Sequence, residues 1–409
     1  AQYESCRRLL AEELGVEPAA ETTRLYEQIR DGTLEVPAPS PARPPTPPHN
    51  LPTPLTPFVG REAELVEIRD RLRDPACRLL TLVGPGGSGK TRLALEAAAR
   101  QIQAPLRRLR STPQMEPLAA GKGAPGTEPT PEPSQGCPSE DGIFFVSLAP
   151  LQSVGAIVPT VAEAIGFSFY GGAGGGAQVE ARRQLLDYLH RKNLLLITDN
   201  FEHVLDGVEL VAEVLEGAPG VKVLATSRVR LRVQGEHLVP VGGMDFPALE
   251  ARAALPPAER LRWIPPHEDR RDKSEDPVQY SAVKLFLVSA RRAWPDFELT
   301  ADNVAHVVRI CRLVEGMPLG IVLAAAWVGM LTPTEIADEI GRSLDFLETD
   351  LRGVPARQRS LRAAFDHSYH LLSEQERGVF QRLSVFRGGF TQDAAQPVAG
   401  GSLRELKAL

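Results

Sequence analysis

Apolar residues follow two different patterns along the chain. Short, mainly apolar runs recur through the middle of the sequence, as at 79–83 and 194–198. Between these runs, apolar residues return every third or fourth position, which predicts amphipathic helices. Runs that are apolar on both faces and alternate with helices are typical of a parallel sheet covered by helices. The pattern therefore predicts an α/β domain in the middle of the chain.

The predicted strands are 79–83, 143–148, 194–198, 221–225 and 237–241. The predicted helices of the same domain are 62–72, 92–99, 156–165, 179–190 and 202–215. Beyond residue 277 the pattern is helical, and the predicted helices are 279–293, 301–313, 319–331, 333–340 and 374–383. Two short helices, 3–14 and 22–29, precede the α/β domain. Ligands of a parallel sheet bind at the carboxyl ends of its strands, so we expect a site at that edge.

Segments that are poor in large apolar residues separate these regions. Residues 34–57 are rich in proline, which predicts an extended linker. Residues from about 104 to 140 are rich in Pro, Gly, Ser and Thr, which predicts a disordered insertion. Residues 171–176 predict a glycine-rich loop, and 246–277 predict a second linker rich in proline and charge.

A glycine-rich turn joins the first strand to the next helix. Its sequence is Gly84-Pro85-Gly86-Gly87-Ser88-Gly89-Lys90-Thr91. Glycines let successive backbone N–H groups point at phosphate oxygens, and the helix N-terminus adds partial positive charge. In such a P-loop, Lys90 reaches the β- and γ-phosphates and the Thr91 hydroxyl binds Mg²⁺. We include Arg92, the next residue, among the predicted nucleotide-binding residues; the alternative is a surface glycine loop.

An acidic residue ends the strand 194–198. Asp199 would hold Mg²⁺, through water, in the Walker B arrangement. The alternative is a plain strand-to-helix turn in which Asp199 or Asn200 caps the helix. Asn200 stands where fast ATPases have a second acid and cannot take a proton, so Glu202 is the nearest carboxylate that could substitute. This pattern predicts slow, switch-like hydrolysis.

The strand 221–225 is followed by Thr226-Ser227-Arg228. A guanidinium at a strand end that faces a P-loop can bind the γ-phosphate in bidentate fashion. Arg228 therefore joins Lys90, Asp199 and Glu202 as a candidate catalytic residue.

Three short motifs resemble those of the signal-transduction ATPases with numerous domains (STAND). They are Phe58-Val59-Gly60-Arg61-Glu62, Thr226-Ser227-Arg228 and Gly316-Met317-Pro318-Leu319, similar to the family's entry motif, first sensor and Gly-Leu-Pro-Leu motif. The resemblance implies that Val59, Gly60 and Arg61 lie against adenine and ribose, and that Pro318 packs near the nucleotide. It implies ATP or ADP as the ligand and Mg²⁺ as the cofactor.

The same resemblance predicts the order of domains. A P-loop nucleotide-binding domain would span 58–245, a helical lid 278–345, a winged-helix-like domain 350–400, and a further helical region would start at 401–409. In this family the winged helix packs against the nucleotide domain, but the basic residues between 352 and 390 leave DNA binding open as an alternative. The family's Met-His-Asp motif cannot be placed here, since His367 lies at a different point of the pattern.

Residues 1–33 resemble a second family. The string from Tyr3 to Pro18, followed by Glu21-Thr22 and Leu25-Tyr26, is similar to the last helical pair of the bacterial transcriptional activation domain of antibiotic-regulatory-type (SARP) activators. A generic helical hairpin is the alternative. In that family a DNA-binding domain lies upstream, so we expect DNA to be contacted by a domain outside this chain.

Composition narrows the classes of function. The chain has 409 residues, enough for two to four domains, and its net charge of −6 argues against a protein that coats nucleic acid. The cysteines have no metal-ligand spacing, which fits a reducing cytoplasm: Cys6, Cys77, Cys137 and Cys311. No apolar run reaches membrane-spanning length. Because the first residue is Ala1, we expect a piece of a longer protein.

Together these features predict a nucleotide switch of a bacterial transcriptional regulator, in which slow ATP hydrolysis is coupled to conformational change or self-oligomerisation. Two alternatives stay open from the sequence. One is a dedicated ATP-hydrolysing enzyme. The other is sequence-specific DNA binding through the C-terminal winged helix.

Overall fold

The computed structural model of the chain describes residues 17–30, 47–110, 139–170, 177–247, 276–349, 359–386 and 391–400, with a few isolated positions between them. It divides into two units, residues 1–46 and 47–409, which we treat separately. In the first unit, helix α2 spans Ala20–Arg30 and includes the predicted helix 22–29. The first part of the linker, the loop 171–176, most of the segments 104–140 and 246–277, and residues 401–409 lie outside the described residues.

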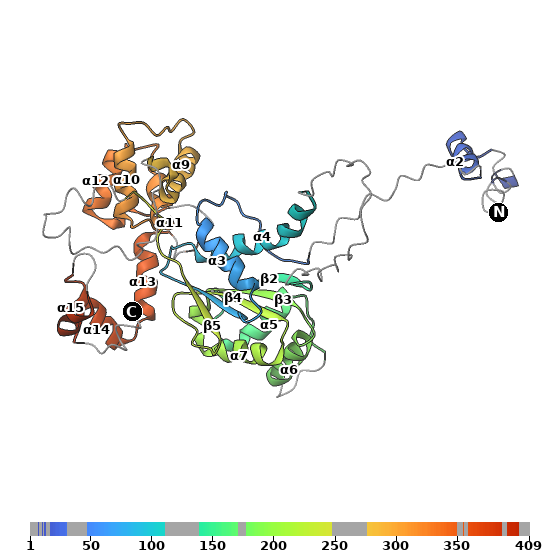
Figure 1. The fold of residues 1–409 in the computed structure, drawn as a ribbon, viewed down its shortest axis with the longest axis horizontal. Coiled ribbons are helices and arrows are strands. Elements are labelled where there is room, and N and C mark those ends of the chain that lie inside the picture. The colour runs from blue at the N-terminus through green and yellow to red at the C-terminus, as the bar shows by residue number, and fades with distance from the viewer. Residues whose placement is uncertain are drawn as a thin grey trace, which may run out of the picture. The chain divides into compact units, whose positions relative to one another are not determined.

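A parallel sheet forms the centre of the second unit (Figure 1). Its strands are β1 Leu79–Val83, β2 Gly142–Ser147, β3 Leu194–Asp199, β4 Val221–Ser227 and β5 Glu236–Pro240. The strand order is β2-β3-β4-β1-β5, and every neighbouring pair is parallel. The predicted α/β fold is therefore confirmed.

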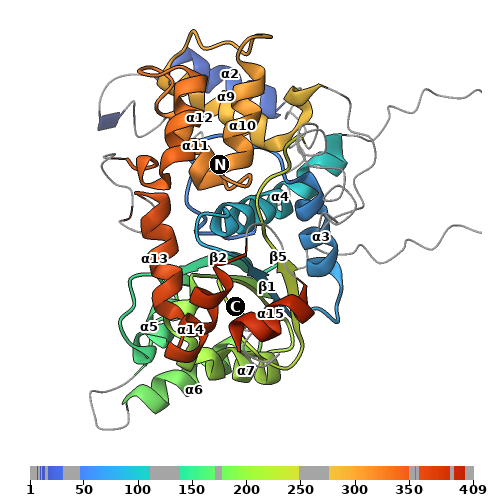
Figure 2. The same cartoon turned by 90° about the vertical axis from the view of Figure 1, so that its left-hand side faces the viewer.

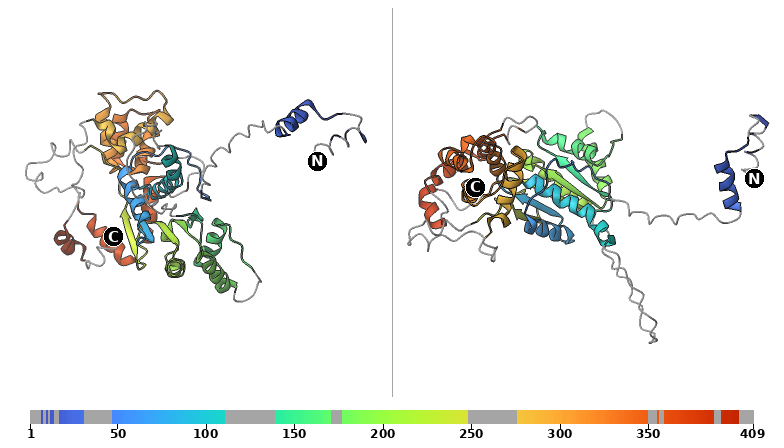
Figure 3. Two further views of the ribbon diagram at one scale, coloured as in Figure 1. Left: turned by 45° about the vertical axis from the view of Figure 1, so that its right-hand side comes forward. Right: turned by 90° about the horizontal axis from the view of Figure 1, so that it is seen from above.

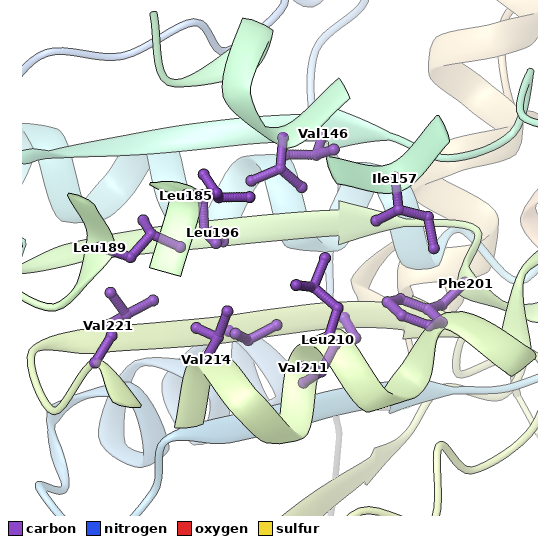
Figure 4. Close-up of a cluster of buried hydrophobic side chains, with 14 of the residues drawn as sticks. Val146, Ile157, Leu185, Leu189, Leu196, Phe201, Leu210, Val211, Val214 and Val221 are labelled. Carbon is purple, nitrogen blue, oxygen red and sulfur yellow. The ribbon is translucent and has the colours of Figure 1, made fainter. Parts of the chain in front are cut away.

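Helices cover both faces of this sheet because its strands are apolar on both sides. Helices α3 (Glu62–Arg73) and α4 (Lys90–Arg110) pack on one face, against residues such as Leu195 and Ile197. The alternate residues Leu194 and Leu196 face the other side. There they pack against α5 (Ile157–Ala164), α6 (Ala177–Leu189) and α7 (Val208–Gly217). The close-up in Figure 4 shows Leu196 in this cluster. This two-residue alternation is the strand period.

A group of four helices, which we call the lid, follows the sheet. They are α9 Ser281–Ala293, α10 Val304–Leu313, α11 Pro318–Ala325 and α12 Pro333–Arg342, with the short turns η4 Pro277–Gln279 and η5 Leu344–Phe346 at the two ends. The lid has its own apolar core, which includes Phe286, Ile310, Ile321 and Ile336. Figure 3 shows the lid helices grouped together apart from the sheet.

The last described helices are α13 (Leu361–Leu371), α14 (Glu374–Leu383) and α15 (Gln392–Ala399). Ser360 caps α13 through its side chain, and a capping box at Ser373 begins α14. Helices α14 and α15 share a small core made by Val379, Leu383, Ala395 and Ala399. Helix α13 runs from the lid alongside the sheet (Figure 2). The winged-helix assignment of this region stays a prediction.

Three predicted elements differ most in their bounds. Helix α4 continues to Arg110, so the insertion cannot start at 104. The predicted helix 202–215 begins as two 3₁₀ turns, η2 Phe201–His203 and η3 Leu205–Gly207, because Asn200 (φ 69°) and Val204 (φ −133°) have non-helical backbones. Helix α11 ends at Ala325, and residues 326–330 form turns.

Candidate nucleotide-binding site

The register of the sheet brings the predicted site residues to one edge. In the pairing of β1 with β4, Val83 lies beside Ser227. In the pairing of β3 with β4, Thr198 lies beside Ala225. Gly84 and Arg228 follow the ends of β1 and β4, and Asp199 is the last residue of β3. All three therefore lie at the carboxyl edge, where ligands of parallel sheets bind.

The loop Gly84–Thr91 has the backbone that its glycines permit. Gly87 (φ 81°) and Gly89 (φ 86°) adopt left-handed conformations that residues with a Cβ rarely take. Lys90 is the first residue of α4, and its ammonium donates to the carbonyl oxygens of Gly84 (2.7 Å) and Pro85 (3.0 Å). The lysine side chain therefore folds back over the loop, where an anionic ligand would meet it.

A carboxylate and two hydroxyl groups form the part of the site suited to a metal. The hydroxyls of Thr91 and Thr226 each donate to Oδ1 of Asp199, both at 2.6 Å. The Thr226 hydroxyl also accepts a hydrogen bond from the backbone N–H of Asn200 at 3.0 Å. Asp199 is only 5% exposed. Hard oxygen ligands of this kind suit Mg²⁺, so Thr91 and Asp199 fit the predicted metal role.

Two polar atoms in the turn that follows Asp199 have no partner among the described residues. They are Nδ2 of Asn200 and Oε2 of Glu202, and both are buried. A buried polar atom without a hydrogen bond is unfavourable, so such atoms indicate a place where a polar ligand or water completes the bonding. This observation supports a polar ligand at this edge of the sheet.

Arg228 connects the sheet to helix α13. Its Nε donates to Oε1 of Glu202 at 3.0 Å, and the two side chains are 8% and 2% exposed. Its Nη1 donates to the carbonyl oxygen of Ala364 at 3.1 Å and to the hydroxyl of Ser368. A methyl group added at Gly86 would lie 3.0 Å from Nη2. The guanidinium therefore lies between the P-loop, Glu202 and α13.

The first turn of α11 also contacts the P-loop. The N–H of Leu319 donates to the carbonyl oxygen of Gly87 at 3.2 Å. A Cβ added at Gly89 would lie 3.7 Å from the ring of Pro318. Pro318 thus lies beside the phosphate loop, near the place that the resemblance implies.

The Phe58–Glu62 motif contacts the P-loop through Arg61. The guanidinium of Arg61 is buried and donates to the carbonyl oxygens of Ser88 (2.8 Å) and Gly242 (2.7 Å). Gly60 packs so closely on the lid that an added Cβ would lie 2.5 Å from Ser281. Direct contact of Val59, Gly60 or Arg61 with adenine and ribose stays a prediction. The Arg92 guanidinium donates to the carbonyl oxygen of Thr56.

Sequence reasoning missed three contributors to the site: Thr226, Ala364 and Ser368. Thr226 enters the sequence analysis only as part of a motif, although a hydroxyl near the end of β4, two positions before Arg228, is a signal of a residue at the site. The contacts of Ala364 and Ser368 have no sequence signal, because they depend on where α13 packs. The rings of His367 on α13 and His203 of η2 make a tilted contact, with centroids 4.9 Å apart and planes at 57°.

No helix among the described residues is both long and apolar enough to cross a membrane. Residues 1–30 match the family model of the bacterial transcriptional activator domain. This match agrees with the resemblance of the N-terminal residues to that domain.

The chain is similar to larger bacterial regulators. It is 33% identical over 331 residues to a putative HTH-type transcriptional regulator of Mycobacterium tuberculosis, covering 80% of this chain and 29% of that protein. It is 28% identical over 405 residues to the regulatory protein AfsR of Streptomyces griseus, covering 95% of this chain and 33% of that protein. The chain thus spans about a third or less of the length of these relatives. The predicted kinship with transcriptional regulators is confirmed.

Among solved structures, the chain is similar to a STAND protein with a tetratricopeptide repeat sensor from Pyrococcus horikoshii. The two share 15% sequence identity with a TM-score of 0.36, and the match covers 90% of this chain and 41% of that one.

Proposed function

We propose that this chain, a relative of bacterial transcriptional regulators, binds ATP and ADP with Mg²⁺ at Gly84–Thr91 and uses the bound nucleotide as a switch. The nucleotide would decide whether α13 stays attached to the sheet. Release of α13 would then expose surface for self-association, and a DNA-binding part of the regulator outside this chain would respond.

The P-loop residues supply the phosphate site. Lys90 exchanges its bonds to the carbonyl oxygens of Gly84 and Pro85 for phosphate oxygens, and the glycine N–H groups provide further donors. Thr91 and Asp199 hold the Mg²⁺ ion, and Thr226 keeps the Asp199 carboxylate in place. When bound, the ion neutralises part of the phosphate charge.

The observation that carries the switch is the set of partners of Arg228. One guanidinium lies against Gly86 of the P-loop and holds both Ala364 and Ser368 of α13. A γ-phosphate at the loop competes with α13 for this guanidinium, whereas a diphosphate does not reach it. ATP and ADP therefore differ in their interaction with the two states, which is what a ligand needs in order to shift an equilibrium.

The same contacts favour slow hydrolysis. Asn200 cannot accept a proton, and Oε1 of Glu202 is paired with Arg228. The ion pair with Arg228 holds Glu202 at Oε1, so both carboxylate oxygens become available to orient water only when Arg228 turns toward the nucleotide. Rapid steady-state turnover, on the order of 10 s⁻¹ as in a typical enzyme, would support the dedicated-ATPase alternative instead.

Hydrogen exchange of α13 tests the switch. We expect residues 361–371 to exchange at least fivefold faster with a non-hydrolysable ATP analogue than with ADP. Arg228→Ala removes the contact in both states, so its exchange should be fast with either nucleotide. Arg230→Ala, an exposed neighbour, is the matched control and should behave like the wild type. Equal exchange of α13 in wild type with the two nucleotides would overturn the proposal.

DNA binding through the C-terminal helices is the second candidate function. The side of α13 that carries Ala364 and Ser368 is occupied by Arg228, which supports packing on the nucleotide domain. Duplex binding with a steep salt dependence in the ATP-analogue state would favour DNA contact.

A further inference from the structure

Arg61 has a role in the structure that its motif did not indicate. Its Nη2 donates to two carbonyl oxygens, Ser88 at 2.8 Å and Gly242 at 2.7 Å. Its Nη1 lies 3.3 Å from Oε1 of Glu64. The side chain is 5% exposed, so these bonds form away from water. One nitrogen carries two hydrogens, and here each hydrogen holds a different segment of the chain.

The first of these segments is the P-loop. In a trans peptide unit the C=O and the following N–H point in opposite directions. Because Arg61 holds the carbonyl oxygen of Ser88 on its own side, the N–H of Gly89 points the opposite way, away from Arg61. Under the proposed function, this is the side of the loop that faces the phosphate. Gly89 keeps this peptide orientation with φ at 86°. Arg61 therefore sets the direction of one phosphate donor.

The second segment is the connection from β5 to the lid. Gly243 is the residue after Gly242, and a Cβ added to it would lie 1.9 Å from the carbonyl oxygen of Glu315. The N–H of Met244 donates to the carbonyl oxygen of Gly316 at 2.7 Å. This connection is therefore fixed to the turn between α10 and α11 of the lid.

The backbone of Arg61 is consistent with a fixed role. Its φ of 62° is left-handed, and so is the φ of 69° at the preceding Gly60. A residue with a Cβ occupies this region at a cost, and strained backbones persist where surrounding contacts hold them. The charge-assisted hydrogen bonds of the guanidinium are contacts that stabilise this backbone conformation.

We propose that Arg61 is a positioning residue that orients the Ser88–Gly89 peptide for phosphate and makes that orientation depend on the position of the lid. The inference rests on the proposed function, since it concerns the regulation of the same phosphate site. It differs from a direct contact with adenine or ribose, because it places the effect of Arg61 on the phosphate half of the nucleotide.

Competition against a fluorescent ADP analogue separates these two roles. In Arg61→Ala, inorganic pyrophosphate should bind at least tenfold more weakly, and adenosine should change less than twofold. Arg61→Lys keeps the charge but not the planar guanidinium. The affinity for pyrophosphate should therefore fall at least threefold, and the affinity for adenosine should stay unchanged. Arg69→Ala, exposed on α3, the helix that begins directly after Arg61, is the matched control. Parallel losses for both competitors, or no loss in Arg61→Lys, would overturn the proposal.

The dependence on the lid is tested by a double-mutant cycle. Gly243→Ala forces the carbonyl oxygen of Glu315 away and should weaken pyrophosphate binding severalfold. In the Arg61→Ala or Arg61→Lys background the same change should have a smaller effect, because the link is already broken. Gly217→Ala, whose Cβ would meet nothing within 4 Å, is the control. Additive effects would show that the lid and Arg61 act separately.

The outcome also separates this inference from the proposed function. If the wild type binds no ADP, both fail. If the wild type binds ADP, Lys90→Ala does not, and the Arg61 variants lose adenosine and pyrophosphate alike, only the inference fails.

Discussion

The second unit has two halves that meet at the P-loop: the sheet half, residues 47–247, and the helical half, residues 276–400. Different kinds of contact hold each half at this loop. The sheet half brings Lys90, Asp199 and Thr226 to one edge through continuous strand pairing. The helical half reaches the same edge through a few contacts, such as the bond from Leu319 to Gly87 and the bonds from Arg228 to α13. A sheet edge cannot lose its register without unfolding, whereas a few hydrogen bonds can be exchanged for ligand contacts.

The difference teaches which half can report the state of a nucleotide. Phosphate binding needs fixed donors, and the sheet half supplies them. A conformational response needs contacts of modest strength, typically ~0.5–1.5 kcal/mol per hydrogen bond and about twice that when one partner is charged. The contacts of Arg228 with α13 fall in this class. Changes in each half should therefore produce different kinds of effect.

The largest expected effect on nucleotide binding comes from removing the ammonium of Lys90 in the sheet half. Lys90→Ala should abolish measurable binding of both ADP and ATP, because among the described residues no other ammonium donates to Gly84 and Pro85. Isothermal titration with each nucleotide measures this. Lys284→Ala, exposed on α9, should bind as the wild type does. If Lys90→Ala keeps its nucleotide affinity, the P-loop is not the nucleotide-binding site.

A smaller effect is expected from removing the hydroxyl of Thr226, which holds the Asp199 carboxylate in place. Thr226→Val removes the hydroxyl that donates to Oδ1 and should weaken Mg²⁺ affinity of the ADP complex by roughly 10- to 100-fold. Titration of Mg²⁺ against a bound fluorescent nucleotide measures it. Thr81→Val is the control, since that buried hydroxyl has no partner among the described residues. Equal losses in both variants would mean that only strand packing changed.

The helical half should respond in the opposite sense. Ser368→Ala removes one partner that competes for Arg228, so affinity for an ATP analogue should rise about fivefold, as expected for a lost bond worth about 1 kcal/mol. ADP affinity should stay the same. Ser384→Ala, exposed beyond α14, is the matched variant. A fall in ATP affinity, or an equal change for ADP, would contradict the competition.

The smallest effect concerns the amino-terminal end of the sheet. Asp141 accepts bonds from the backbone N–H of Asn193 (2.7 Å) and from Lys192 (3.0 Å), and these bonds, the backbone one first, lower the pKa of its carboxyl. A carboxyl with a lowered folded-state pKa stabilises the fold above its unfolded pKa, about 3.9, and less as pH falls below it. Asp141→Asn should therefore lose about 1 kcal/mol or less near pH 7.

Denaturant unfolding at several pH values measures that loss, which should shrink as the pH falls below about 4. Asp296→Asn, exposed after α9, is the control. Nucleotide affinity should not change in Asp141→Asn, because this residue lies at the end of the sheet opposite the site. A change in affinity would mean that the sheet half is less rigid than its pairing indicates.

The sequence allowed the sheet half to be predicted but not the contacts of the helical half. Strand runs, the glycine loop and Asp199 are local features, so their pattern was sufficient. Asn200 was seen as an amide in place of an acid, but its left-handed backbone, which turns the predicted helix into 3₁₀ turns, depends on the packing around it. The partners of Arg61 and Arg228 include backbone carbonyl oxygens, which every residue carries and no motif marks.

The strand order has a consequence for how the protein is made. β1 ends at the P-loop, yet both of its neighbours, β4 and β5, come much later in the chain, and Leu79 pairs with Val223 and Glu236. A ribosome adds roughly 5–20 residues per second, so the P-loop strand waits many seconds before it can join a sheet. Such long-range pairing also slows folding. Nascent chains that stop before β4 should therefore be unable to retain nucleotide, which makes nucleotide capture a late event in synthesis.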